Sequence, residues 1–224
     1  MKKLIIITGA SSGLGEAISE HYLREEECKI ISISRRVSKK QEQLSTDKFQ
    51  FISQDLSGQL KKQTLSALEE NINNYDEIIF FNNAGTIEPL SEFKNSSKKL
   101  IHNALMININ TPIELIHFLL SYSELKKMKF INISSGAYKQ SIENWSIYSS
   151  CKAFTFRFFE ILKAEFSTQN QISFISIDPG VIDTNIQDTI RERSFPMGEY
   201  FRSLKSNNQL RSATEAAAFV INQI

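Results

Sequence analysis

Short apolar runs alternate along the chain with longer stretches of helical periodicity, and this alternation constrains the fold more than any other feature. The runs are mostly apolar without strict apolar–polar alternation, and they cover residues 4–8, 29–33, 49–53, 77–81, 129–133 and 172–177. Such runs are typical of strands covered on both faces by helices. The helical stretches between them cover residues 13–26, 58–73, 96–120 and 146–166. The alternation predicts an α/β fold of Rossmann type, a doubly wound parallel sheet of six strands in a single domain spanning residues 1–224.

Composition excludes several classes of function. With 26 basic and 25 acidic residues, the formal net charge of +1 gives the chain no electrostatic reason to bind nucleic acid or an anionic membrane. No stretch approaches the ~20 apolar residues of a membrane span, and the short apolar run after Lys2 and Lys3 is too brief for a secretory signal. Two cysteines, Cys28 and Cys151, are expected to be free thiols of a cytoplasmic protein. The three histidines form no ligand pattern, so we expect no metal.

A glycine-rich turn joins the first expected strand to the first expected helix, and it reads Thr8-Gly9-Ala10-Ser11-Ser12-Gly13-Leu14-Gly15. Glycine lets the turn be tight and lets the backbone approach a pyrophosphate closely. The helix N-terminus offers free N–H groups and a partial positive charge to the anion. In this strand–turn–helix context, the turn predicts a dinucleotide site rather than a mere connection. Its candidate residues are Gly9, Ser11, Ser12, Gly13, Leu14 and Gly15.

The residues that follow the second expected strand indicate which dinucleotide binds. An NAD enzyme needs a carboxylate there for the ribose 2′-hydroxyl, whereas an NADP enzyme needs cations for the 2′-phosphate. The chain has Arg35 and Arg36 there and no acid. We therefore expect NADPH or NADP+ as cofactor, with solvated loop charges as the alternative interpretation of the two arginines. Asp55 and Leu56 follow the third strand and are candidates for contacting the adenine, although Asp55 could instead be a helix cap.

Further motifs follow the fourth, fifth and sixth expected strands and lie on the helix after the fifth. Asn83-Ala84-Gly85 follows the fourth expected strand, Ser135 follows the fifth, Tyr148 and Lys152 lie on the next helix, and Pro179-Gly180 follows the sixth strand. Together with the glycine turn, these motifs resemble the classical short-chain dehydrogenase/reductase family over nearly the whole chain. The phrases at 83–90, 108–112, 145–148 and 179–185 are similar to the sepiapterin reductase-like branch of that family, including bacterial benzil reductases that form (S)-benzoin.

The resemblance implies a role for each matching residue. Tyr148, Lys152, Ser135 and Asn108 would be catalytic, with Asn108 supporting a water that links Lys152 to solvent. Asn110 is an alternative to Asn108, and Ser134 would lie on the cofactor side of Ser135. The remaining cofactor contacts would come from Asn83, Ala84, Gly85, Tyr148, Lys152, Pro179, Gly180, Val181, Ile182 and Thr184, with Val181 or Ile182 at the nicotinamide carboxamide and Thr184 at a phosphate or that carboxamide.

The spacing of Tyr148 and Lys152 also has a chemical meaning of its own. Residues at i and i+4 share one face of a helix. A phenol with a pKa of ~10 is a poor acid–base partner at neutral pH, and an adjacent ammonium lowers that pKa. We therefore expect Lys152 to bring the pKa of Tyr148 toward the working pH, and Ser135 to stabilise a developing alkoxide. Because Tyr-x-x-x-Lys also occurs on ordinary surface helices, the interpretation depends on Ser135 and the glycine turn.

Aromatic and apolar residues surround the expected pocket, and they are Tyr138, Trp145, Val181, Phe195, Met197, Tyr200 and Phe201. A cleft of this kind suits a neutral, flat carbonyl compound, and core packing is the alternative. We expect Ser135, Trp145 and Tyr148 to contact an aromatic α-diketone or a pterin-like diketone. Residues 183–210, with weak periodicity, are expected to form a substrate lid. A capping box at Ser212 opens a final helix through Val220.

Two functions follow from these motifs. The first is an NADPH-dependent carbonyl reductase acting on a small molecule, with Tyr148 as general acid. The second is a non-catalytic NADP(H)-binding redox sensor or regulatory protein on the same fold. Relatives usually add a seventh strand after the last helix, and its apparent absence here weakens the expectation of a dimer or tetramer.

Overall fold

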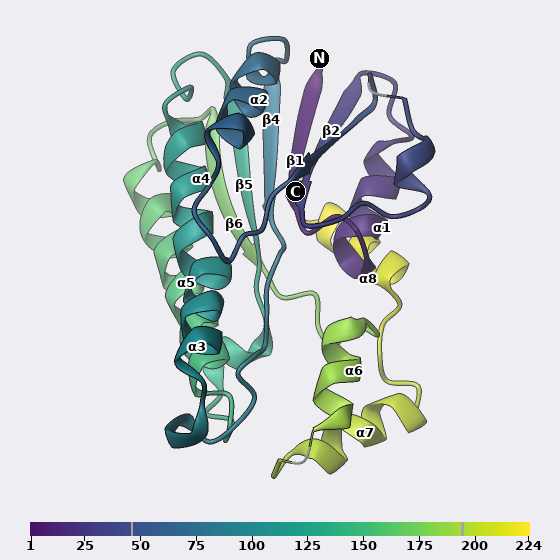
Figure 1. The fold of residues 1–224 in the computed structure, drawn as a ribbon. Helices are drawn as coiled ribbons and strands as arrows, with labels where there is room; N and C mark the ends of the chain where they lie inside the picture. Colours follow the sequence, from purple (N-terminus) through teal and green to yellow (C-terminus); the bar gives the residue numbers. More distant parts are fainter. Residues whose placement is uncertain (46, 194) are drawn as a thin grey trace.

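The computed structural model describes residues 1–45, 47–193 and 195–224, and its centre is a six-stranded parallel sheet (Figure 1). The strands are β1 (Lys3–Thr8), β2 (Cys28–Ser34), β3 (Phe49–Ser53), β4 (Glu77–Asn82), β5 (Lys127–Ile133) and β6 (Ile172–Ile177). Their order in the sheet is β3-β2-β1-β4-β5-β6, and every neighbouring pair is parallel. The expected Rossmann-type α/β fold is thereby confirmed. The order reverses between β1 and β4, where open parallel sheets bind ligands beyond the carboxyl ends of the strands.

Helices cover both faces of the sheet. The α-helices are α1 (Gly13–Tyr22), α2 (Lys62–Ile72), α3 (Lys98–Leu105), α4 (Thr111–Leu120), α5 (Ser146–Glu165), α6 (Asn185–Glu192), α7 (Gly198–Ser206) and α8 (Ala213–Ile221). Short 3-10 helices lie at Gln41–Gln43, Phe93–Asn95 and Gly136–Lys139, and a π-helical turn at Met106–Asn110. In Figure 1, α2, α4 and α5 lie on one side of the sheet, and α1 and α8 lie on the other.

The apolar strands supply a separate core to each face. In β1, Leu4 and Ile6 belong to the cluster with α2, α4 and α5, whereas Ile5 and Ile7 belong to the cluster with α1 and α8. Successive side chains of a strand point to opposite faces. A strand that is covered twice therefore needs apolar residues at every position, which explains the runs without alternation.

The expected boundaries differ from the observed ones at several helices. The helix expected at 96–120 is built from α3, the π-helical turn and α4 in succession, after a start at Lys98. The helices expected at 13–26 and 58–73 are shorter than predicted: α1 ends at Tyr22, and α2 begins at Lys62. The capping box of α8 is present, with Ser212 Oγ accepting from the Glu215 N–H at 3.2 Å.

Helices α6 and α7 form an excursion from the sheet that the weak periodicity did not predict. They lie below both layers in Figure 1, at the carboxyl ends of the strands. The excursion is closed at its base, because Ile182 and Arg211 form a parallel bridge. Its buried side chains, among them Ile190, Phe201 and Leu204, pack in a third cluster with Trp145 and Tyr148. These helices are short and bury only two or three residues each, so the apolar positions that would indicate them in the sequence are few. Residue 194 of this segment lies outside the described residues.

Within the part of the chain that the structure describes, no helix combines the length and the apolar content that crossing a membrane requires.

Candidate active site

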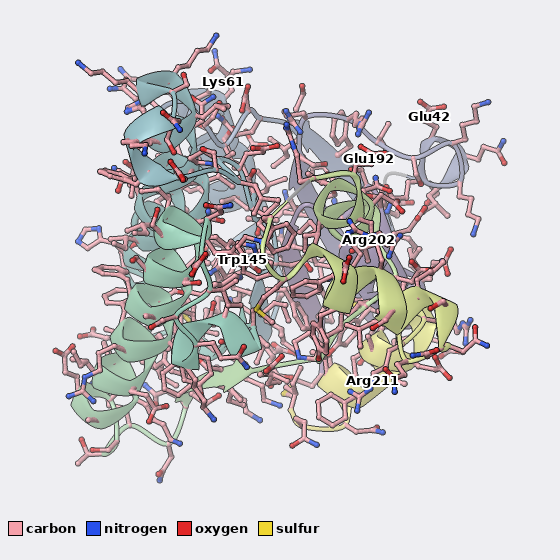
Figure 2. The ribbon with its side chains drawn as sticks, turned by 90° about the horizontal axis from the view of Figure 1, so that it is seen from below. Glu42, Lys61, Trp145, Glu192, Arg202 and Arg211 are labelled. Atoms are coloured by element: carbon pink, nitrogen blue, oxygen red, sulfur yellow. The ribbon has the colours of Figure 1, made fainter. Side chains whose placement is uncertain are left out.

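A cleft of about 700 Å³ runs along the carboxyl ends of the strands. Figure 2 looks from below toward this end of the molecule, with Trp145 near the centre of the view. Apart from Asn108, every residue predicted to contact cofactor or substrate, or to act in catalysis, lines this cleft. Motifs that are spread from Gly9 to Thr184 in the sequence thus lie together in one cavity.

The glycine turn lies at one end of the cleft in a conformation that requires glycine. Gly9 and Gly13 have φ angles of 71° and 58°, which side chains rarely adopt. A Cβ atom on Gly15 would lie 2.4 Å from the carbonyl oxygen of Gly9 and 2.5 Å from Asn83 Nδ2. The turn therefore has room for backbone alone, and the first turn of α1 follows it directly.

The loop after β4 holds this turn in place. Asn83 Nδ2 donates to the carbonyl oxygens of Thr8 (2.9 Å) and Gly9 (3.1 Å). In return, the N–H groups of Asn83 and Ala84 donate to the Thr8 hydroxyl oxygen at 3.1 and 3.0 Å. Asn83, which the resemblance implied only as a cofactor contact, thus also shapes the backbone of the turn. Thr8 was missed as its partner because nothing in the sequence places residues 8 and 83 side by side.

The turn fits an anionic group. Ser12, the residue before α1, makes no side-chain capping bond within the described residues, so its hydroxyl remains available. Both Ser11 and Ser12 line the cleft beside the N-terminus of α1. Free N–H groups, a helix dipole and two hydroxyls are the donors that a pyrophosphate accepts.

At the end of β2, Arg35 and Arg36 are exposed and line the cleft. Across from them, Asp55 accepts hydrogen bonds from the Ser57 N–H (2.9 Å) and hydroxyl (2.8 Å). These bonds, and to a smaller extent the charge of Arg35, hold the pKa of Asp55 below its ordinary value. Asp55 thus forms a local turn with Ser57 and lines the cleft with Leu56. It is not the helix cap of the alternative interpretation, because α2 begins at Lys62 after Lys61 as its N-cap.

Ser135, Tyr148 and Lys152 lie together in the middle of the cleft. Ser135 follows β5 and caps the 3-10 helix at Gly136–Lys139, accepting from the Ala137 N–H at 3.3 Å. Tyr148 and Lys152 occupy successive turns at the start of α5. Lys152 Nζ lies 5.8 Å from the centre of the Tyr148 ring and donates to the Ile133 carbonyl oxygen at 2.7 Å.

The pKa of Tyr148 moves against the expectation from sequence. Burial raises it, because the phenolate loses its hydration, and the nearby charge of Asp178 adds to the rise. The nearby Ser135 hydroxyl opposes this effect. The expected net lowering by Lys152 is therefore wrong for this arrangement. Burial also acts on Lys152, whose pKa it lowers to about 8, although Asp178 and Cys151 oppose the change.

Asn108 lies behind this group, in the π-helical turn before α4. It is 5% exposed, and its amide makes a reciprocal pair with the Thr86 backbone: Oδ1 accepts from the N–H at 3.0 Å, and Nδ2 donates to the carbonyl at 2.9 Å. Asn110 is exposed, and its amide reaches only Met106 Sδ, at 3.4 Å. Of the two candidates, the structure thus buries Asn108 beside the site.

The Cys151 thiol is also buried beside the site, and burial raises its pKa to about 11, as expected of an inert packed cysteine.

The loop after β6 closes the cleft on its far side. Gly180 has a φ of 78°, and its N–H donates to Asp178 Oδ1 at 3.0 Å. A Cβ on Gly13 would meet Thr184 Cγ2 at 3.0 Å, which places Thr184 against the glycine turn. Pro179, Val181 and Ile182 line the cleft between them.

Trp145 forms the aromatic wall beside Tyr148. The two rings meet edge to face at 5.6 Å, and Phe201 of α7 stacks on Trp145 at 5.2 Å. Tyr200 also lines the cleft. Three of the expected aromatic and apolar residues do not. Tyr138 stacks instead on Phe156 at 4.0 Å, while Phe195 and Met197 pack behind the wall. The alternative interpretation, packing, holds for those three.

Sequence reasoning missed several residues of the cleft, including Glu88, Gln140, Asp178 and Gln187. Asp178 could have been found, because it directly precedes Pro179-Gly180. Gln187 carried no signal, since it depends on a helix that the pattern did not predict. No group of three or more metal-ligating side chains occurs in the described parts of the chain.

Comparison with known proteins gives consistent results. A family model described as short chain dehydrogenase matches residues 3–194. A benzil reductase ((S)-benzoin forming) of Bacillus cereus is 32% identical, over 98% of this chain and 93% of that protein. A protein of the same description from Bacillus subtilis is also 32% identical, over 94% of this chain and 88% of that protein. The crystal structure of the KRED1-Pglu enzyme superposes with a TM-score of 0.83 at 27% identity, covering 97% of this chain and 92% of that one.

Proposed function

The chain belongs to the short-chain dehydrogenase family, whose oxidoreductase chemistry acts on carbonyl and alcohol groups, and from this premise we propose that it is an NADPH-dependent carbonyl reductase for aromatic α-diketones. The observation that carries the proposal is the meeting of Ser135, Tyr148 and Lys152 in a cleft whose other end holds the glycine turn and two arginines. The benzil reductases among its relatives support the substrate class.

The dinucleotide would be held by groups already described. The glycine turn and the N-terminus of α1 bind its pyrophosphate, and Arg35 and Arg36 bind the 2′-phosphate through charge-assisted hydrogen bonds. Asp55 and Leu56, which line the cleft, would contact the adenine, and Thr184, which lies against the glycine turn, would contact a phosphate. When bound, NADPH supplies the hydride.

The residues of the chain handle the carbonyl oxygen and its proton. Ser135 donates a hydrogen bond to the oxygen and polarises the carbonyl. Tyr148 donates its phenolic proton as negative charge develops on that oxygen. The Lys152 ammonium stabilises the phenolate that remains, and Asn108 is a positioning residue that fixes the backbone behind it through Thr86.

The protonation state of Tyr148 suits a general acid. Because burial raises the pKa of Tyr148, the phenol stays protonated at neutral pH, which is the state that a general acid requires. A general base for alcohol oxidation would instead require the phenolate. The Lys152 ammonium, with a pKa of about 8, is mostly charged under the same conditions.

The experiment that tests this function follows NADPH oxidation with benzil and with a pterin-like diketone, for the wild-type protein and for Tyr148→Phe. We expect turnover of benzil by the wild type and a loss of at least ~100-fold in kcat for the variant, the size of effect that removal of a general acid produces. A wild type that binds NADPH tightly and reduces no member of a broad carbonyl panel would instead support the redox-sensor function. Faster turnover of the pterin-like diketone would move the substrate to that class.

Two further proposals concern the location of the enzyme and the segment that covers its cleft. The free thiols Cys28 and Cys151 are both buried, which is compatible with the reducing cytoplasm that we propose as the location of the enzyme. Residues 183–210, which carry α6 and α7, are proposed as the substrate lid. Arg193 on this segment forms an ion pair of 2.7 Å with Glu88, which lines the opposite side of the cleft.

A further inference from the structure

Three buried polar atoms of residues that line the cleft have no hydrogen-bond partner among the described residues: Ser134 Oγ, Trp145 Nε1 and Gln187 Oε1. Ser134 directly follows β5, and the other two side chains, those of Trp145 and Gln187, lie at the α6–α7 segment. Both side chains are more than nine-tenths buried, at 4% and 8% exposure, and both line the cleft. Buried donors and acceptors are almost always paired in folded proteins, so an unpaired set beside a reaction centre points to a ligand that pairs with it.

Trp145 lies next to the reacting group. Its ring meets the Tyr148 ring edge to face at 5.6 Å, and Phe201 and Phe195 hold it from the other side. Figure 2 shows it in the interior, between the teal helices and the yellow-green α6–α7 segment. The indole N–H can only donate. Since the packing fixes the ring, the donor has a fixed place beside the phenol.

Gln187 reaches the same region from α6. It lies three residues before Ile190, so both residues share one face of the helix. Ile190 is 1% exposed and belongs to the cluster that contains Trp145 and Tyr148. Rotation of the Gln187 amide exchanges its oxygen and nitrogen, so the side chain can present either an acceptor or a donor to a ligand.

We infer that Trp145 and Gln187 form a second polar subsite, which holds the non-reacting carbonyl oxygen of a 1,2-dicarbonyl substrate. This inference rests on the proposed carbonyl reductase function and names its specificity. One carbonyl accepts from Ser135 and Tyr148 and is reduced to the alcohol. The adjacent carbonyl accepts from Trp145 Nε1–H and Gln187 Nε2–H and remains a ketone. The product is therefore an α-hydroxy ketone, formed by one hydride from NADPH and one proton from Tyr148.

A second subsite also explains discrimination. A site built to hydrogen-bond a substrate group rejects an analogue that lacks the group, because its own buried polar atoms are then left unpaired. Benzil and deoxybenzoin make a matched pair: they have the same two phenyl rings, and deoxybenzoin has a methylene in place of the second carbonyl. The subsite predicts a preference for benzil beyond the difference in intrinsic reactivity of the two ketones.

The kinetic test compares kcat/KM for benzil and deoxybenzoin in four proteins: wild type, Trp145→Phe, Gln187→Leu and Leu204→Val. Trp145→Phe keeps an aromatic ring in the stack and removes the N–H together with the five-membered ring, so a packing control is needed beside it. We expect the benzil-to-deoxybenzoin ratio to fall about tenfold in each of the first two variants, the effect of losing one neutral hydrogen bond. Leu204→Val is the packing control, because Leu204 belongs to the same buried cluster as Trp145 without lining the cleft, and it should leave the ratio within twofold of wild type.

Binding provides a readout that does not depend on turnover. Trp145 is the single tryptophan of the sequence, so quenching of its fluorescence reports on this wall alone. With saturating NADP+, we expect Gln187→Leu to raise the Kd of benzil about tenfold and to change that of deoxybenzoin much less.

The outcomes separate the two levels of the proposal. Turnover of both ketones with an unchanged ratio in Trp145→Phe and Gln187→Leu would overturn the subsite and leave the reductase function in place. A wild-type protein that neither binds nor reduces either ketone would overturn the function and the subsite together.

Discussion

The Lys152 ammonium donates a 2.7 Å hydrogen bond to the carbonyl oxygen of Ile133, the last residue of β5. This bond ties the second turn of α5 to the central sheet at the point where the cleft opens. It holds a partly buried cation beside Tyr148, although the loss of hydration disfavours the charge and lowers its pKa to about 8. The chemistry of the site therefore depends on a charge that is lost under mildly alkaline conditions.

The first prediction concerns this charge. Lys152 loses its proton as the pH rises through about 8, whereas Tyr148, with its raised pKa, stays protonated well above that pH. We expect kcat/KM for carbonyl reduction to fall above about pH 8 with the loss of one proton. In Lys152→Arg, kcat should be lower because the guanidinium has a different shape, but the alkaline decline should vanish because arginine stays charged. A wild-type profile that is flat to pH 10 would contradict this assignment.

The second prediction concerns Asp178, whose negative charge raises the pKa of both Tyr148 and Lys152. Asp178→Asn removes that charge and keeps an oxygen that can accept from the Gly180 N–H. We expect the alkaline decline of kcat/KM to move to lower pH, with a larger effect at low ionic strength. If the profile moves to higher pH, or does not move in low salt, Asp178 does not act on the pair.

The third prediction concerns the choice of cofactor. A double substitution, Arg35→Ala with Arg36→Ala, should weaken NADPH binding by about 10–100-fold, since hydrogen bonds to charged groups contribute about 1.5–3 kcal/mol. NADH binding should change by less than about threefold. Lys39→Ala serves as control, because it removes an exposed cation of the same loop that does not line the cleft. Isothermal titration gives all the affinities, and equal losses for the two nucleotides would refute the assignment of the 2′-phosphate.

The fourth prediction concerns the glycine turn. A Cβ on Gly15 would lie 2.4 Å from the Gly9 carbonyl oxygen, so Gly15→Ala must displace the turn or the Asn83 side chain. We expect a loss of about 1–3 kcal/mol in the free energy of unfolding, together with weaker NADPH binding. At Gly58, a Cβ would find only the Asp55 carbonyl oxygen, at 3.8 Å, so Gly58→Ala should be nearly neutral. Urea unfolding measures the free energy of unfolding of both variants. Equal stability of the two would show that the turn accommodates the added methyl group at little cost.

The fifth prediction separates the two asparagines of the π-helical turn. Asn108→Ala leaves the N–H and carbonyl of Thr86 without their partners in a buried place, which should cost about 1–3 kcal/mol of stability and lower kcat at least tenfold. Asn110→Ala, at an exposed position, should change the free energy of unfolding by less than about 0.5 kcal/mol. Thermal unfolding and steady-state kinetics measure these effects. A larger loss of kcat in Asn110→Ala would reverse the assignment.

Much of the fold could be predicted from sequence because its signals are local. Apolar runs without alternation predict doubly covered strands, and all six were found within two residues of their expected limits. Tyr148 and Lys152 share a helical face because they are four residues apart, and Gly9 to Gly15 form their turn through their own backbone freedom. Helices α6 and α7 escaped prediction because their apolar residues are few and serve a wall formed with residues 87–148.

The chemistry of the same side chains was decided by tertiary structure. The spacing of Tyr148 and Lys152 predicts that they meet, but not how much water reaches them. Burial of Tyr148 depends on the cluster that Trp145 forms with Ile190 and Phe201, more than forty positions away along the chain. The pKa of a buried group is a sum over every segment that excludes water or places a charge nearby, so it cannot be read from neighbours in sequence. The sequence therefore determined which groups take part, and the packing of distant segments determined their protonation and which buried donors are left for a substrate.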